Sequence, residues 1–206
     1  MPEIQIPAHD NGQFKAYIAM PQGAPSAVVI MIQEIFGINQ EMRDKCDDMA
    51  SKGYIAICPD LFWRIEPNIE LIDSNPEELQ RAFDLFGQFD AQMGLADLKT
   101  TLSFARTYDG ANGKVGCVGY CLGGKLAYML ACDSDIDASV SYYGVGIEDM
   151  TDGASNLQNA LLMHIAEEDE FVPKDAQEQI KLALMPRHQI TIHSYAGVNH
   201  AFARGQ

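Results

Sequence analysis

The apolar positions of the chain fall into short runs that are separated by polar, glycine-containing turns. The β-branched run at 27–33 is continuous, as in a strand buried on both faces, whereas residues 14–20 alternate as a half-buried strand does. Other runs of strand length occur at 54–60, 114–120, 137–143, 160–166 and 189–195. The pattern therefore predicts a sheet built from many short strands.

Between these strands the apolar spacing becomes helical. Helices are predicted at 40–52, 122–132 and 174–184. Another begins at Asn75-Pro76, and its pattern continues to residue 106 as two helices that break near Gly94. Strands that alternate with helices favour an α/β fold with a mostly parallel sheet covered by helices on both faces.

The length and composition fit one globular domain. The chain has 206 residues, 47% of them hydrophobic, and we expect a single domain over 1–206. The Gly/Asp/Ser-rich segment at 144–159 is expected to be a wall or lid rather than a domain boundary. The formal net charge of −15 argues against nucleic acid and anionic membranes as partners. The net charge does not exclude an anionic small-molecule substrate, because one arginine can dominate the electrostatic field inside a pocket.

Cysteine usage and the N-terminal segment indicate a cytoplasmic protein. The five cysteines form no disulfide framework, and no Cys/His cluster has the spacing of a zinc site. The start of the chain lacks the basic and apolar regions of a secretory signal, and no apolar run approaches the ~20 residues that span a bilayer. We expect neither a metal nor a cofactor, and the oligomeric state (monomer or small homo-oligomer) is open.

The stretch GYCLGGK places Cys121 between two glycines at a predicted strand-to-helix turn. Such a cysteine is either small core filler or a nucleophile on a sharp turn, the nucleophile elbow. Glycines at positions 119 and 123 would remove Cβ atoms where strand and helix approach. The free N–H groups of a helix beginning at Leu122 would favour a thiolate and an oxyanion.

A base and an acid follow in the order that such a nucleophile requires. His200 lies on a loop after the last strand, and Asp169 lies on the loop after the preceding strand. Taken singly, each residue could belong to a solvated surface loop. His164 lies inside the run at 160–166, where a core histidine is the simpler interpretation. The agreement in order and position favours Cys121, Asp169 and His200 as a catalytic triad.

With these residues in place, the chain resembles the dienelactone hydrolase (carboxymethylenebutenolidase) family of the α/β-hydrolase fold. The resemblance rests on QEIFGIN, CPDLF, GKVGCVGYCLGGKLA, SYYGVG, EDEFVP and NHAFAR, which follow one another as in that family. The resemblance extends over almost the whole chain. It implies that Cys121, His200 and Asp169 form the triad and that Glu34 pairs with the resting thiol. Together with the geometry of the fold, it places the oxyanion between the backbone N–H groups of Ile35 and Leu122.

The implied reaction is hydrolysis of an ester or lactone through a thioester, with no cofactor. The resemblance implies that Arg204 binds a substrate carboxylate and that Tyr142 lines the pocket. Arg81 matches the family's second arginine only with a shift of two residues, which turns a helical side chain by about 200°. Family members also continue into a final helix, so the C-terminal helix is expected to be missing from 1–206.

Three alternatives to a dienelactone hydrolase stay open. A broad carboxylesterase or thioesterase would use the same chemistry on other substrates. A non-catalytic binding protein could have kept the fold. A thiol-redox protein is disfavoured because Cys121 has no resolving cysteine adjacent in sequence, and Cys117 belongs to the preceding strand.

Overall fold

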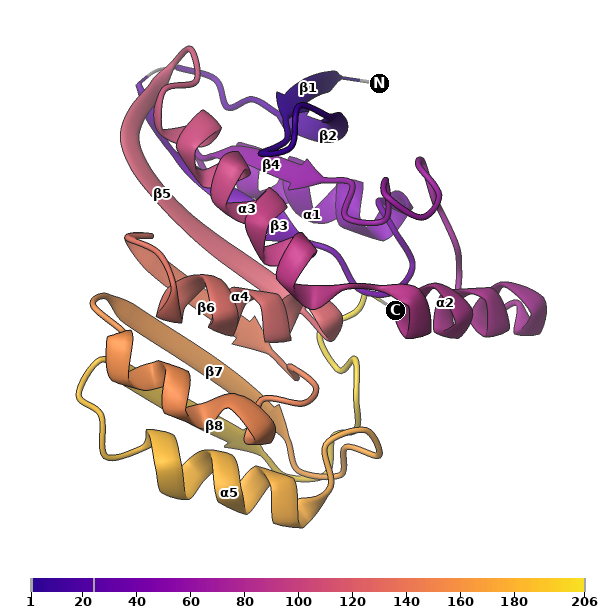
Figure 1. The fold of residues 1–206 in the computed structure, drawn as a ribbon, viewed down its shortest axis with the longest axis vertical. Helices are drawn as coiled ribbons and strands as arrows, with labels where there is room; N and C mark the ends of the chain where they lie inside the picture. Colours follow the sequence, from indigo (N-terminus) through magenta and orange to yellow (C-terminus); the bar gives the residue numbers. More distant parts are fainter. Residues whose placement is uncertain (1, 24, 206) are drawn as a thin grey trace. The chain divides into compact units, whose positions relative to one another are not determined.

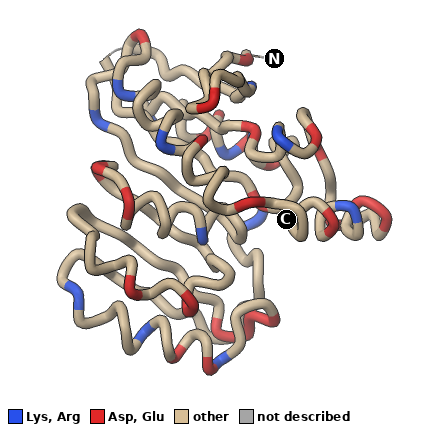
Figure 2. The backbone as a smooth tube through the Cα atoms, viewed as in Figure 1, with Lys and Arg blue, Asp and Glu red and all other residues tan. Residues whose placement is uncertain are grey.

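The computed structural model describes residues 2–23 and 25–205, and the chain divides into two compact units between Gly116 and Cys117. Strand β5 (Ala111–Tyr120) runs through this boundary. Figure 1 shows the helices and strands of both units. Figure 2 shows that acidic residues occur along both units and that basic residues are fewer in each.

In the first unit, strands of the sheet lie side by side in the order β1-β2-β4-β3. Its elements are β1 (Glu3–Pro7), β2 (Gln13–Ala19), β3 (Ser26–Ile32), α1 (Gln40–Ser51), β4 (Ile55–Pro59), α2 (Pro76–Gln88) and α3 (Ala91–Arg106). Strand β2 is antiparallel to β1 and β4, whereas β3 and β4 are parallel. All five residues of β4 are buried, because α1 and α3 cover opposite faces of the β3–β4 pair (Figure 1).

The helix pattern of the first unit differs from the prediction at one point. The break lies at Phe89–Asp90, not at Gly94, because the Asp90 side chain accepts hydrogen bonds from the N–H groups of Gln92 and Met93 and so begins α3. Gly94 lies inside α3, where a Cβ atom would come within 2.4 Å of the Phe89 ring. The absence of a side chain at position 94 allows this close contact, and the helix continues through it.

The second unit continues the alternation of strands and helices. It contains the end of β5, α4 (Leu122–Cys132), β6 (Ala138–Tyr142), the 3-10 helix η1 (Glu148–Asn156), β7 (Ala160–Ala166), α5 (Lys174–Leu184) and β8 (Ile190–Tyr195). Strands β6, β7 and β8 are parallel, and their register places Tyr142, His164 and His193 side by side. The carboxyl ends of these strands therefore lie at one edge of the sheet.

The core of the second unit explains the segment at 144–159. Ile147, Ala154 and Leu157 are almost fully buried and belong to the same apolar cluster as Ile180 of α5 and Met163 of β7. The segment is thus part of the hydrophobic core of this unit.

Strand β1 was not predicted, but all other strand predictions are confirmed to within a few residues. No helix among the described residues is long and apolar enough to cross a membrane.

Candidate active site

Cys121 lies between β5 and α4 in a backbone conformation that L-residues rarely adopt. Its φ angle is 55° and its ψ angle is −116°. The Cys121 N–H donates to the carbonyl of Tyr142 at 3.1 Å, and its own carbonyl accepts from the N–H of Lys125 at 3.1 Å. A strained conformation persists only where its surroundings hold it, and such positions cluster at functional sites. The thiol therefore stands on a turn of the nucleophile-elbow type.

Glycines allow the turn to close. A Cβ atom on Gly119 would lie 1.9 Å from the carbonyl oxygen of Gly123, and one on Gly124 would lie 2.4 Å from the carbonyl oxygen of Tyr142. Side chains at these positions would push α4 away from β5 and β6. The contact of Gly124 with β6 depends on tertiary packing, so the sequence motif alone does not reveal it.

The chain enters α4 directly after the thiol. Cys121 is the N-terminal capping residue of this 11-residue helix but makes no side-chain capping hydrogen bond. The first N–H groups of a helix have no intrahelical acceptor, and the positive end of the helix dipole lies there. This position favours negative charge on the sulfur and on an oxyanion formed beside it.

Asp169 and His200 form a buried hydrogen-bonded pair in the same unit. The Nδ1 atom of His200 lies 2.8 Å from Oδ2 and 3.0 Å from Oδ1 of Asp169. Asp169 is 6% exposed and also accepts from the N–H groups of Phe171 and Val172 at 2.9 and 3.2 Å. These donors offset the cost of burying the carboxylate. Because a carboxylate can only accept, the proton lies on Nδ1 and the lone pair of His200 lies on Nε2.

Two aromatic rings hold the imidazole of His200 in place. Tyr143 and Phe171 each lie 4.9 Å from it, centroid to centroid, and both meet it edge-on. The Nε2 atom is buried and has no hydrogen-bond partner among the described residues. The free nitrogen of an oriented, neutral histidine is the arrangement that a general base requires.

Tyr142 contacts the loop that carries His200, and Arg204 lies on that loop. Tyr142 ends β6, and its ring centroid lies 6.1 Å from that of Phe202, two residues after His200. Burial raises the pKa of Tyr142 above its ordinary value, so this tyrosine keeps its proton at neutral pH. Arg204 is partly buried, and its backbone N–H closes a turn with the carbonyl of Ala201 at 2.9 Å.

Three other predicted site residues belong to the first unit. Glu34 and Ile35 lie two and three residues after the end of β3, and each is 6% exposed. Neighbouring Gln33 is fully buried and accepts a hydrogen bond from the Leu61 N–H at 3.2 Å, which ties this segment to the loop after β4. Arg81 lies on α2 with its side chain about half exposed, and it pairs with Glu66. The structure thus gives Arg81 a partner other than a substrate.

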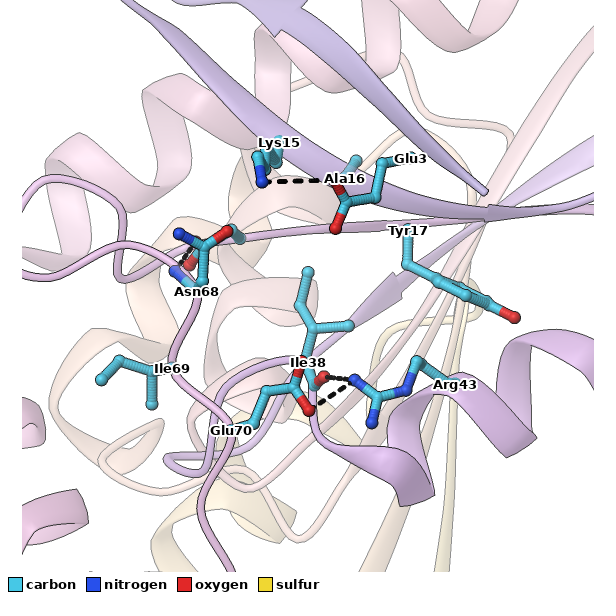
Figure 3. A pocket seen from close by; sticks show the side chains of 10 residues that line it. Glu3, Lys15, Ala16, Tyr17, Ile38, Arg43, Asn68, Ile69 and Glu70 are labelled. Atoms are coloured by element: carbon cyan, nitrogen blue, oxygen red, sulfur yellow. Dashed lines mark hydrogen bonds and ion pairs between the residues drawn. The ribbon is translucent and has the colours of Figure 1, made fainter. Parts of the chain in front are cut away.

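A cavity of about 40 Å³ also lies in the first unit (Figure 3). Charged side chains line it in pairs: Arg43 contacts Glu70 at 2.8 Å, and Lys15 contacts Glu3 at 3.2 Å. Asp60 accepts from the Asn68 N–H at 2.8 Å, and burial raises the pKa of this carboxyl group above its ordinary value. None of the predicted site residues lines this cavity, and it is too small for an ester substrate.

Comparison with known proteins identifies the family. The model of the dienelactone hydrolase family matches residues 14–206. The chain belongs to the dienelactone hydrolase family. It is therefore a carboxylic ester hydrolase, and the predicted α/β-hydrolase fold is confirmed.

Individual members of the dienelactone hydrolase family align over nearly the whole chain. A putative carboxymethylenebutenolidase of Azospirillum brasilense is 46% identical over 99% of this chain and 88% of its own. The carboxymethylenebutenolidase of Pseudomonas putida is 36% identical over 98% of this chain and 85% of its own. The crystal structure of a putative dienelactone hydrolase from Klebsiella pneumoniae has a TM-score of 0.83 and 30% identity, over 97% of this chain and 86% of its own.

Proposed function

We propose that the protein hydrolyses an ester or lactone through a Cys121–His200–Asp169 triad and a thioester intermediate. The observation that carries this proposal is the buried Asp169–His200 pair, which leaves Nε2 of His200 without a partner among the described residues. The strained turn that presents Cys121 from the same unit supports it. A buried carboxylate and a strained nucleophile both cost stability, and catalysis gives each a purpose.

In the first half of the reaction, Nε2 of His200 removes the thiol proton and the Cys121 sulfur attacks the carbonyl carbon. The oxygen of the tetrahedral intermediate accepts a hydrogen bond from the backbone N–H of Leu122, at the start of α4. The intermediate collapses when the C–O bond to the leaving oxygen breaks. The proton on His200 passes to that oxygen, and an acyl thioester stays on Cys121.

In the second half, His200 removes a proton from water, and the hydroxide attacks the thioester carbonyl. The C–S bond then breaks, and the sulfur regains the proton from His200, which yields a carboxylic acid. Asp169 keeps the imidazole in one tautomer and stabilises its positive charge at both stages. We predict that Ile35 supplies the second oxyanion N–H and that Glu34 holds the resting thiol.

The substrate proposed here is a small ester or lactone that carries a carboxylate. Arg204 lies four residues after His200, on the same loop, and is the cation proposed to bind that carboxylate. Tyr142 is proposed to line the acyl pocket, because its ring packs near the loop that carries His200. The carboxymethylenebutenolidases among the relatives support a lactone substrate.

The test compares Cys121→Ala with Cys132→Ala. Both thiols belong to the second unit and are almost equally buried, at 8% and 7% exposure, so Cys132→Ala is a matched control. Hydrolysis of p-nitrophenyl acetate should fall by more than about 10³-fold in Cys121→Ala and change little in Cys132→Ala. Mass spectrometry of the quenched wild-type protein should locate the acyl group on Cys121.

Retained activity in folded Cys121→Ala would remove this thiol from the mechanism. Labelling of Cys121 without turnover of any ester would instead indicate a binding protein with the same fold.

A further inference from the structure

Tyr195 and His164 form a hydrogen-bonded pair that the proposed chemistry does not use. Tyr195 is the last residue of β8, and its hydroxyl lies 2.8 Å from Nδ1 of His164 on β7. Tyr195 is 37% exposed, whereas His164 is 8% exposed. The bond joins residues 31 positions apart, so it fixes the end of β8 against the neighbouring strand.

Aromatic rings from both neighbouring strands stack against the imidazole of His164. Its ring stacks on Tyr142 at 4.2 Å with an interplanar angle of 16°, and on His193 at 5.9 Å from the other neighbouring strand. Burial, with a smaller contribution from His193, lowers the pKa of His164 below 6.5. The ring is therefore a neutral and fixed hydrogen-bond partner for Tyr195 at neutral pH.

Phe202 connects this pair to the base. Its ring lies 5.1 Å from Tyr195, 5.5 Å from Tyr143 and 6.1 Å from Tyr142, centroid to centroid. Between Phe202 and His200, Ala201 has a φ angle of 63°, and its carbonyl accepts from the Arg204 N–H. The turn is tight, so a displacement of the Phe202 ring would move His200 as well.

The turn that carries His200 is consequently held on two sides. Asp169 binds the imidazole directly, and the Phe202 ring packs on Tyr195, whose own orientation is set by His164. We propose that Tyr195, oriented by His164, is a positioning residue that acts through Phe202 to hold Nε2 of His200 at its reacting position. This inference rests on the proposed function of His200 as the general base.

The test compares kinetic constants of variants that remove the hydroxyl or its partner. Tyr195→Phe keeps the ring that Phe202 contacts but loses the hydrogen bond. We expect kcat for p-nitrophenyl acetate to fall about 10-fold while KM changes less than about 2-fold, because a slightly misplaced base slows the chemical step. His164→Leu should show the same loss. His164→Asn, which places a polar atom near the position of Nδ1, should recover most of it.

The two positions should also be coupled. A double variant of Tyr195→Phe and His164→Leu should lose no more kcat than either single variant, because both remove one interaction. Phe202→Leu removes the aromatic contact between Tyr195 and the turn that carries His200, and its kcat should fall at least as far as that of Tyr195→Phe. Tyr128→Phe is the matched control, since it removes a buried hydroxyl that donates to backbone carbonyls at 3.2 Å elsewhere in this unit. It should lower the melting temperature without lowering kcat.

A second measurement does not depend on hydrolysis. The Nδ1 proton of His200, which Asp169 accepts, should give a downfield NMR signal that is absent from Asp169→Asn. In Tyr195→Phe and Phe202→Leu this signal should broaden and exchange faster with solvent. The positioning role is overturned if both variants keep the wild-type signal, or if Tyr128→Phe lowers kcat as much as Tyr195→Phe. A protein that turns over no ester but shows these NMR changes would refute the proposed function alone.

Discussion

A Cβ atom on Gly119 would lie 1.9 Å from the carbonyl oxygen of Gly123, well inside van der Waals contact. The end of β5 and the first turn of α4 touch at this point without any side chain between them. The tight turn at Cys121 depends on this contact, because a wider separation would carry the thiol away from the helix N-terminus.

Gly119→Ala should therefore disrupt the turn. We expect a loss of about 3 kcal/mol or more in the free energy of unfolding, measured by urea denaturation, because the neighbouring atom is backbone and cannot move aside. Gly87→Ala is the control: it lies in α2 with no atom within 4 Å of the added Cβ, and alanine there should stabilise the helix by about 0.5–1 kcal/mol. Equal stability of Gly119→Ala and the wild type would contradict the close contact.

Asp169→Asn should lower kcat by about 10³–10⁴-fold with a small change in KM, because an amide no longer fixes the proton on Nδ1 of His200. Asp175→Asn, an exposed carboxylate at the start of α5, should retain wild-type kinetics. Steady-state hydrolysis of p-nitrophenyl acetate measures both variants. A loss below 10-fold in Asp169→Asn would show that the pair is structural.

Arg204→Ala should reduce kcat/KM about 10–100-fold for a lactone that carries a carboxylate, since a charge-assisted hydrogen bond contributes about 1.5–3 kcal/mol. A neutral aryl ester should be unaffected. Arg81→Ala, tested in parallel, should leave both substrates unchanged because Arg81 already pairs with Glu66. Equal losses on neutral and anionic substrates in Arg204→Ala would argue against a carboxylate site.

Asp97 joins three parts of the first unit and should contribute strongly to stability. This fully buried carboxylate on α3 accepts from Trp63 Nε1 at 2.9 Å and from Arg64 at 2.9 and 2.7 Å. Asp97→Ala should lower the free energy of unfolding by about 2–3 kcal/mol, because it removes the acceptor of Trp63 and leaves Arg64 paired only with the exposed Asp10. Asp48→Ala, which removes an exposed pair with Lys52, should cost less than about 0.5 kcal/mol in the same urea titration.

The buried thiol of Cys117 should make stability depend on pH in the alkaline range. Loss of solvation raises its pKa from 9.0 to about 11 in the folded protein. The folded state therefore keeps a proton that the unfolded state loses, so stability is full below pH 9 and declines until about pH 11. Urea midpoints measured across this range should fall less steeply in Cys117→Ala than in the wild type. Identical slopes would assign the decline to other groups.

Much of the fold could be predicted from short stretches of sequence. Apolar periodicity located every strand except β1, an edge strand in which Ile6 is the one fully buried residue and the apolar signal is therefore weak. The predicted break at Gly94 was wrong because the Asp90 side chain caps and begins α3, which then continues through Gly94. A capping interaction of one side chain at the end of a helix is not revealed by a periodic pattern.

The order of Cys121, Asp169 and His200 along the chain follows from the alternation of strands and loops, and the glycines beside Cys121 follow from local steric limits. The sequence predicted Asp169 from the four consecutive acids at 167–170. Only the tertiary structure showed that this carboxylate contacts His200 and that His164 bonds to Tyr195 on the neighbouring strand. The sequence determines such features where the interacting atoms lie within a few residues. Contacts between residues 31 positions apart depend on strand register and loop path, which only the folded chain settles.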